Sequence, residues 1–199
     1  STSRSQVSLA FNNLWNSTFF CGNGNFTDTD FVLHRNAFSD PAVVADAKPM
    51  VISRTLFSQS ALDIDGNNVY YRGPGVTTGL NLHVDATETD IILQDNFVTV
   101  RAELSPCAVS VTALQLTLAA LSDRPRSGNT VSLYNNSFQA SQSTSQHCAA
   151  GEYTRLTGAA LVPDSEQAVR FNVTRNYIYA YSQSEFAESD ALVVSLSGN

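Results

Sequence analysis

The stretch Leu62-Asp-Ile-Asp-Gly66-Asn67-Asn68-Val69-Tyr-Tyr71 decides the fold that we predict for this chain. Gly66 and Asn67 suit the positive φ angles of a tight turn, and residues of high β-propensity lie on both sides of them. A turn of this kind between two strand-like runs is typical of a β-hairpin, in which the two strands pair antiparallel. The stretch therefore predicts antiparallel sheet structure.

Strand-like runs continue along the chain on both sides of this turn. Alternating apolar and polar residues, separated by turn residues, predict roughly ten to twelve short strands at the spacing of sandwiches and barrels. The segment Val109–Leu121 is predicted to be a strand rather than a helix because it contains several β-branched residues. We find no convincing helix and no internal repeat. The fold class predicted is all-β, an antiparallel β-sandwich of two sheets.

Composition limits the classes of function. The 199 residues suit one domain, and only 15% of them are charged, with a net charge of −7. Lys48 is the only lysine, and no basic run exists, which argues against nucleic acid as a partner. No apolar run approaches the length of a membrane span, so we expect no membrane insertion.

Cysteines and glycosylation sequons give little information. Cys21, Cys107 and Cys148 are either one disulfide with a free thiol left over or three reduced thiols. The Asn-x-Ser/Thr sequons are about as frequent as this composition produces by chance, so they do not indicate glycosylation. They occur at Asn16, Asn25, Asn135 and Asn172.

No pattern of catalytic or metal-binding residues is found. His34, His83 and His147 are far apart in the sequence and form no H-x-H or H-x-x-x-H pair. No G-x-S-x-G motif or equivalent nucleophile context occurs. Asp63 to Asn67 begins like a calcium loop but lacks the later ligands, and a turn explains it more simply. We therefore expect no enzyme activity, no cofactor and no metal.

Two other groups of residues are candidates for binding. Tyr177, Tyr179 and Tyr181 lie on one face of a predicted strand, either as an aromatic binding stripe or as a face buried in the core or at a subunit contact. Arg124 and Arg126 present two bidentate donors in a predicted loop, either for a ligand or for ordinary solvation.

The residues Leu14-Trp15-Asn16-Ser17-Thr18, then Cys21 and Asp30-Phe-Val-Leu-His-Arg35, resemble the start of the head domain of adenovirus fibre proteins. Ala61 to Tyr70 and Arg175 to Ile178 are similar to later patches of that family. Asn16 in place of a threonine, and the absence of a Phe-Ser-Tyr ending, indicate a divergent, non-mammalian type. The resemblance implies that residues 1–13 are the end of a shaft or a linker tail and that residues 14–199 are a receptor-binding head.

The same resemblance implies a function. The chain would be the head of a non-catalytic viral attachment protein, a homotrimer on the virion surface that is assembled in the host-cell nucleus. Its partners would be a host-cell surface receptor, protein or glycan, and the rest of the fibre shaft and capsid. Contacts are expected in the exposed loops at residues 72–75, 122–127 and 135–147. The candidate contact residues are Arg72, Arg124, Arg126, Tyr134 and His147.

A second family gives an alternative. Leu156-Thr-Gly158 and Phe186-Ala-Glu-Ser189 are similar to the end of tumour necrosis factor-like trimeric ligands. This resemblance implies a secreted trimeric ligand that binds a cell-surface receptor, with a disulfide between Cys107 and Cys148.

Overall fold

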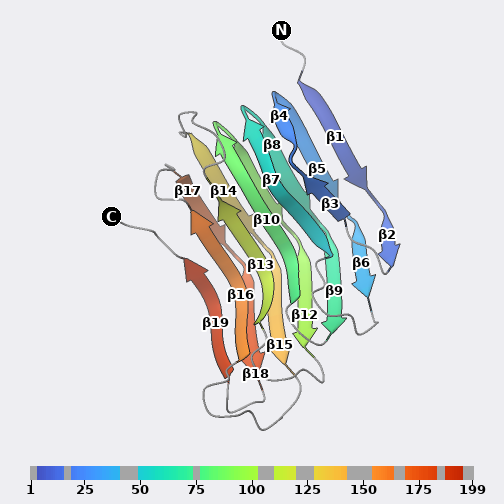
Figure 1. Cartoon of the computed structure of the whole chain (residues 1–199), viewed down its shortest axis with the longest axis vertical. Helices are drawn as coiled ribbons and strands as arrows, with labels where there is room; N and C mark the ends of the chain where they lie inside the picture. The colour runs from blue at the N-terminus through green and yellow to red at the C-terminus, as the bar shows by residue number, and fades with distance from the viewer. Residues whose placement is uncertain are drawn as a thin grey trace.

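Parallel strands build the whole of the fold that is described. The computed structural model describes residues 4–15, 19–40, 49–73, 77–102, 110–119, 128–142, 154–163, 169–182 and 187–194. Nineteen strands in these ranges form three sheets, and no helix occurs there. Figure 1 shows the strands stacked side by side in layers that run the length of the molecule. The absence of helix within these ranges agrees with the all-β prediction.

The chain visits the three sheets in a fixed order, sheet A, sheet B and sheet C. Sheet A contains β1 (Ser5–Ala10), β5 (Thr29–His34), β8 (Ala61–Asp65), β11 (Asp90–Gln94), β14 (Asn129–Tyr134) and β17 (Val169–Thr174). Sheet B contains β2 (Asn13–Trp15), β6 (Ala37–Asp40), β9 (Asn68–Gly73), β12 (Phe97–Ala102), β15 (Ser137–Gln142) and β18 (Tyr177–Ser182). Sheet C contains β3 (Phe19–Gly22), β4 (Asn25–Thr27), β7 (Met50–Ser58), β10 (Thr77–Thr87), β13 (Ser110–Leu118), β16 (Thr154–Pro163) and β19 (Ala187–Val194). Each strand pairs in parallel with the strand one circuit away, so the fold is a parallel β-helix of six coils.

The prediction of an antiparallel β-sandwich is therefore wrong. The turn at Gly66 and Asn67 does join two strands, but β8 lies in sheet A and β9 in sheet B. β8 pairs in parallel with β5 and β11, and β9 pairs with β6 and β12. Gly66 has the positive φ of 63° that a hairpin turn would also use, so the local signal was the same. The turn changes the direction of the chain from one sheet to the next without reversing it.

The prediction of no internal repeat is also wrong. The turn between sheet A and sheet B recurs in every coil and places one asparagine at the same position each time. These asparagines are 24, 31, 29, 40 and 40 residues apart along the chain. The spacing varies because the connections from sheet B to sheet C and from sheet C to sheet A differ in length, which hides the repeat from a search at fixed period.

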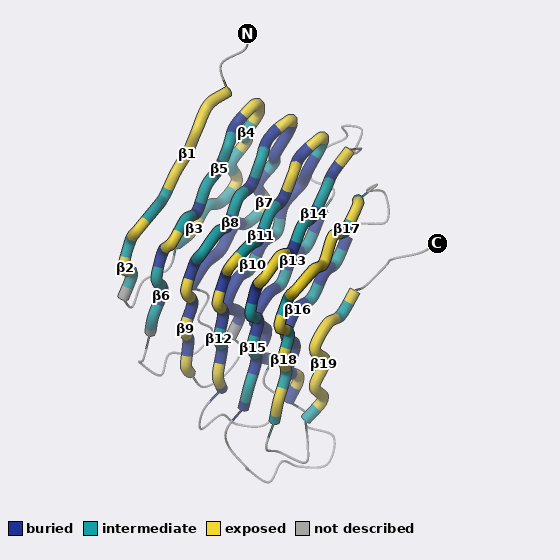
Figure 2. The backbone as a smooth tube through the Cα atoms, turned by 180° about the vertical axis from the view of Figure 1, so that it is seen from behind, coloured by how far each residue is buried: buried dark blue, intermediate teal, exposed yellow. Residues whose placement is uncertain are grey.

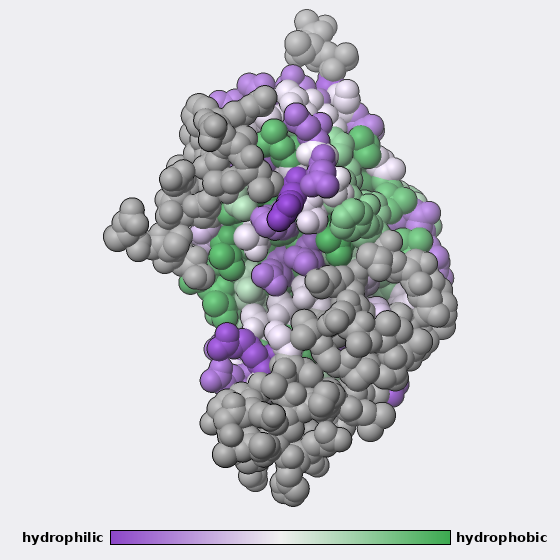
Figure 3. Space-filling view, viewed as in Figure 1, coloured by the Kyte–Doolittle hydropathy of each residue, from purple (hydrophilic) through white to green (hydrophobic). Residues whose placement is uncertain are grey.

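The core fills the space between the sheets with rows of side chains, one from each coil. Met50, Leu80 and Leu114 form one row in sheet C, and Ile52, Leu82 and Leu116 form the next. All six side chains are completely buried. In Figure 2 the middle coils are the most buried and the last strands are largely exposed. On the face seen in Figure 1, polar and apolar side chains are mixed (Figure 3).

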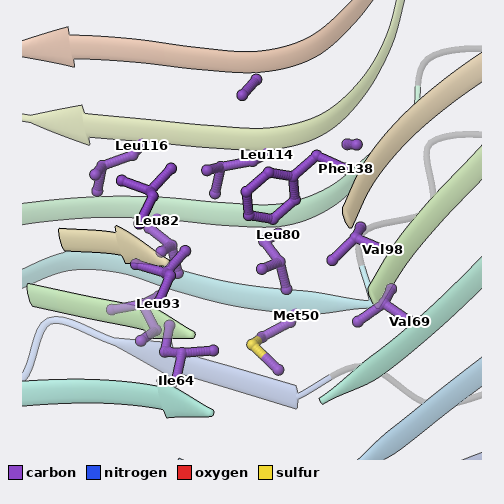
Figure 4. Close-up of a cluster of buried hydrophobic side chains, with 14 of the residues drawn as sticks. Met50, Ile64, Val69, Leu80, Leu82, Leu93, Val98, Leu114, Leu116 and Phe138 are labelled. Carbon is purple, nitrogen blue, oxygen red and sulfur yellow. The ribbon is translucent and has the colours of Figure 1, made fainter. Parts of the chain in front are cut away.

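Residues from all three sheets meet in this core. Figure 4 shows Ile64 and Leu93 of sheet A, Val98 and Phe138 of sheet B and Leu82 of sheet C around one apolar centre. Burying a side chain of this size stabilises the fold by about 1.5–3 kcal/mol. The stacked rows therefore provide most of the driving force that holds the coils in register.

Candidate functional site

A column of asparagines fixes the geometry of the outward faces. At each turn from sheet A to sheet B, a residue with positive φ precedes a half-buried or buried asparagine. The side-chain amide of each asparagine donates to the side-chain oxygen of the asparagine in the next coil, at 2.8–3.1 Å. We call this column the asparagine ladder. It consists of Asn12, Asn36, Asn67, Asn96, Asn136 and Asn176.

A second column lies at the turn from sheet C to sheet A. Thr29, Ser60, Thr89 and Asn129 are buried there, each after a residue with positive φ. The hydroxyls of Thr29, Ser60 and Thr89 donate to the carbonyl two residues earlier, at 2.7–2.9 Å. The asparagine ladder and this second column border sheet A on both sides, so outward side chains in successive coils keep a constant register.

The most distinctive outward face belongs to sheet B. Tyr177, Tyr179 and Tyr181 project from β18 and are 57%, 38% and 45% exposed. They alternate with Ile178 and Ala180, which pack against the core. Neighbouring tyrosine rings stack with centroids 6.0 Å apart and an interplanar angle of 16°. Because the rings stack on one another along the strand, their edges and hydroxyls are the parts that a partner would meet.

The rest of this face is polar with isolated aromatic residues. The strand beside β18 carries Ser137, Gln139 and Ser141 opposite the three tyrosines. Further along the sheet lie the exposed Phe97 and Tyr70, and Arg101 stands opposite Arg72 in the register. We call this surface the tyrosine face, and it comprises the outward side chains of β9, β12, β15 and β18.

The outward face of sheet A carries a small acidic cluster. His34 Nδ1 lies 2.6 Å from Asp65 Oδ2, close enough for the ring N–H to donate. Burial raises the pKa of Asp63, and the neighbouring Asp65 raises it further, while His34 opposes the shift. Within the described part of the chain, Asp63 Oδ1 is buried without a hydrogen-bond partner. Burial and the neighbouring Asp65 therefore both disfavour the charged form of Asp63.

Two shallow polar hollows lie beside the turn from sheet C to sheet A. The larger, of about 600 Å³, is lined by Arg4, Asp28, Gln59, Ser60, Glu88 and Asp90. The smaller, of about 510 Å³, is lined by residues 128–130 together with Val169 and Arg170. Arg4 Nε is paired with Asp30 Oδ1 at 3.0 Å, so the cation in the larger hollow is already matched by a carboxylate.

The candidate contact residues do not form one site. Arg72 is exposed on sheet B, whereas Tyr134 is exposed on sheet A, where Arg175 Nη1 donates to its hydroxyl at 3.0 Å. Arg124, Arg126 and His147 lie outside the described residues. Phe97 and Tyr70 were missed as candidates. Their only sequence signal is that each alternates with buried neighbours in its strand.

The remaining candidates from the sequence are the histidines and the stretch that begins like a calcium loop. His34 lies in sheet A and His83 in sheet C. Among the described residues, no group of three or more His, Cys, Asp or Glu could hold a metal ion. Asn67 belongs to the asparagine ladder, where its side chain is committed to the neighbouring coils.

The stretch around Leu14 lies in the first coil of the β-helix. β1 pairs with β5 over six residues, and β2, which contains Leu14 and Trp15, pairs with β6. Cys21 is a partly buried free thiol. Burial raises the pKa of this thiol above its usual value, and a hydrogen bond with Thr55 offsets part of the rise. Cys107 and Cys148 lie outside the described residues.

Comparison of the chain with family models, curated proteins and solved structures finds no match. In the ranges that the structure describes, no helix is long and apolar enough to cross a membrane.

Proposed function

We propose that this chain is a non-catalytic attachment module that binds a receptor on a cell surface through the tyrosine face. The observation that carries the proposal is the exposed row Tyr177, Tyr179 and Tyr181. Tyrosine is enriched at protein interfaces because its ring buries a large area and its hydroxyl forms a directed hydrogen bond. Three such side chains in one row provide the kind of aromatic anchors on which binding energy concentrates.

The scaffold supports this role by holding the row rigid. Each tyrosine leaves a strand whose backbone is paired with β15 over six residues. The asparagine ladder at the start of β18 fixes the position of the strand in the coil. A binding surface that is already ordered loses little conformational entropy when its partner binds. The viral setting and the virion-surface location are proposals that rest on the resemblance of residues 14–35 to fibre heads.

The test is cell binding by the fluorescently labelled chain, measured by flow cytometry on cultured epithelial cells. We expect the variant Y177A/Y179A/Y181A to bind at least about tenfold more weakly, because each aromatic anchor contributes about 1 kcal/mol or more. Phe20→Ala, at an exposed aromatic residue on sheet C, is the matched control and should bind like the parent chain. Prior treatment of the cells with trypsin or neuraminidase distinguishes a protein receptor from a sialylated glycan. Equal binding by the triple variant and the parent would refute the proposal.

One observation favours a second function, glycoside hydrolysis on sheet A. Burial and the neighbouring Asp65 raise the pKa of Asp63, which is the direction that a general acid requires. The Cα atoms of residues two apart on a strand lie about 6.6 Å apart, and the two carboxyl groups of inverting glycosidases are roughly 6.5–9.5 Å apart. Release of reducing ends from a panel of soluble polysaccharides, abolished by Asp63→Asn, would establish this function. No release from any of them by the parent chain would exclude these substrates.

A further inference from the structure

Within the described residues, the first and sixth coils of the β-helix each leave one side of the core uncovered. β17, β18 and β19 each have a described partner on one side only, and so do β1, β2 and β3. Side chains that occupy core rows are consequently exposed at the ends: Val7 by 41% in the first coil, and Val173, Leu192 and Val194 by 41%, 42% and 46% in the sixth. In Figure 3, apolar side chains line the margin where β19 lies in Figure 1. Unpaired strand edges over an apolar interior are a surface on which another β layer can pair.

We propose that copies of this chain associate end to end, with the sixth coil of one copy seated on the first coil of the next. The occupant of the exposed end is thus a second copy, and the three sheets continue from one copy into the other. This interface is separate from the tyrosine face and does not depend on its function.

The core rows carry the first argument. Extending each row by one coil places Val173 beside Leu9 of the next copy and Phe171 beside Val7, because both pairs occupy the same rows of sheet A. In sheet C the same extension places Leu192 beside Phe19 and Val194 beside Cys21. Three of these four contacts join two apolar side chains, and the fourth joins Val194 to the weakly polar thiol of Cys21. The six residues of β17 also match the six residues of β1.

The asparagine ladder carries the second argument. Within the body, each ladder asparagine donates its backbone N–H to the side-chain oxygen of the next, as Asn67 does to Asn96 at 3.0 Å. At the end of the ladder, the N–H of Asn176 has no described acceptor. At the other end, the side-chain oxygen of Asn12 has no described donor. A second copy in the same register joins this donor to this acceptor, so the ladder would run on without interruption.

End-to-end stacking has a measurable geometry. Six coils at the strand separation of about 4.8 Å give a repeat of about 29 Å per copy. The contact joins two different surfaces, so it does not close on itself and produces open assemblies. The tyrosine faces of successive copies would then lie along one side and present repeated binding rows.

Sedimentation velocity of the 199-residue chain, from low to high micromolar concentration, tests the proposal. We expect species at multiples of the 21.5 kDa chain mass that grow with concentration and pass beyond three copies. Val173→Lys alone and Leu9→Glu alone should each stay monomeric, because a charge then faces an apolar row. An equimolar mixture of the two variants should form dimers, because Val173 of the Leu9→Glu copy still meets Leu9 of the Val173→Lys copy. Growth of the mixture beyond dimers requires the lysine of one copy to face the glutamate of the other. Circular dichroism melting of each variant shows whether its fold is retained.

Three results would overturn the proposal. The first is a mass of one chain at every concentration. The second is a closed trimer that does not grow further, which would instead agree with the resemblance to fibre heads. The third is growth that persists in folded Val173→Lys, because association would then use another surface. Electron microscopy of the concentrated chain provides a second measurement, the expected axial repeat of about 29 Å.

Discussion

The substitution Asn67→Ala tests whether the asparagine ladder stabilises the β-helix. Asn67 is 1% exposed and makes contacts in both directions. Its Nδ2 donates to the carbonyl of Leu33 at 2.8 Å and to Asn96 Oδ1 at 3.1 Å. Its Oδ1 accepts the backbone N–H of Asn36 at 2.9 Å and the side-chain amide of Asn36 at 3.1 Å.

Alanine at this position removes the side chain that satisfies those groups. The backbone N–H of Asn36 loses its acceptor in a buried place, which costs about 1–3 kcal/mol, and the lost bond to Leu33 adds about 1 kcal/mol. The amide of Asn36 keeps its bond to the carbonyl of Leu9. We therefore expect the free energy of unfolding to fall by about 2–4 kcal/mol. For a chain of this length, the melting temperature should fall by about 4–16 °C.

Urea unfolding followed by circular dichroism measures this change, and the midpoint shift should come without a change in the slope. The matched control is Asn172→Ala, an exposed asparagine on β17 whose Nδ2 is 3.4 Å from Ser132 Oγ. Its effect should stay within about 0.5 kcal/mol. If Asn67→Ala destabilises the protein no more than Asn172→Ala does, the asparagine ladder does not stabilise the β-helix.

Three further predictions concern stability. Phe57→Ala should cost about 3–5 kcal/mol in urea unfolding, because the ring is completely buried against Phe26 and Phe31 at centroid distances of 5.3 and 6.0 Å; Phe20→Ala, at an exposed site, should have little effect. Asp63→Asn should raise the melting temperature at neutral pH. Because the folded pKa of Asp63 lies above its usual 3.8, ionisation destabilises the fold as pH rises, and the advantage of the variant should disappear below that value. Gly66→Ala should cost about 1 kcal/mol at its φ of 63°, and Gly66→Asn should cost less, which thermal melts of both variants would show.

The positions of strands and turns could be predicted from the sequence, but their partners could not. Alternation of apolar and polar residues predicts strands at β7 and β10, a short apolar run predicts β5, and turn residues predict the breaks at Gly66-Asn67 and Asp95-Asn96. A residue with positive φ followed by asparagine is compatible both with a hairpin and with a turn between two sheets of a β-helix. Which of these two structures forms depends on whether the asparagine side chain can hydrogen-bond to another asparagine in the neighbouring coil. That contact lies 24–40 residues distant at irregular intervals, so no local pattern reveals it.

The candidate binding surface was also predictable only in part, because the local pattern gives the face of a strand but not what lies next to that face. Period-two alternation places Tyr177, Tyr179 and Tyr181 on one face, as expected. Their exposure depends on the outward face of sheet B being left uncovered by the other described strands, which only the arrangement of the sheets shows. Arg72 was selected from a predicted loop and Tyr134 from the end of a predicted strand. The two residues lie on strands of different sheets, so proximity between them did not follow from the sequence.

The direction of the strands also decides which kind of self-association the ends allow. All described strand pairs are parallel. The strands of the sixth coil therefore run in the direction that lets them pair in parallel with the first coil of another copy. A two-fold dimer through two sixth coils would reverse the strands across the contact and bring the N–H of Asn176 against its own copy. Two donors would then meet with no acceptor between them, whereas head-to-tail contact joins this donor to the oxygen of Asn12. The ladder that holds the coils together therefore favours open stacking over a two-fold dimer at this end, and a discrete dimer in sedimentation would contradict this reasoning.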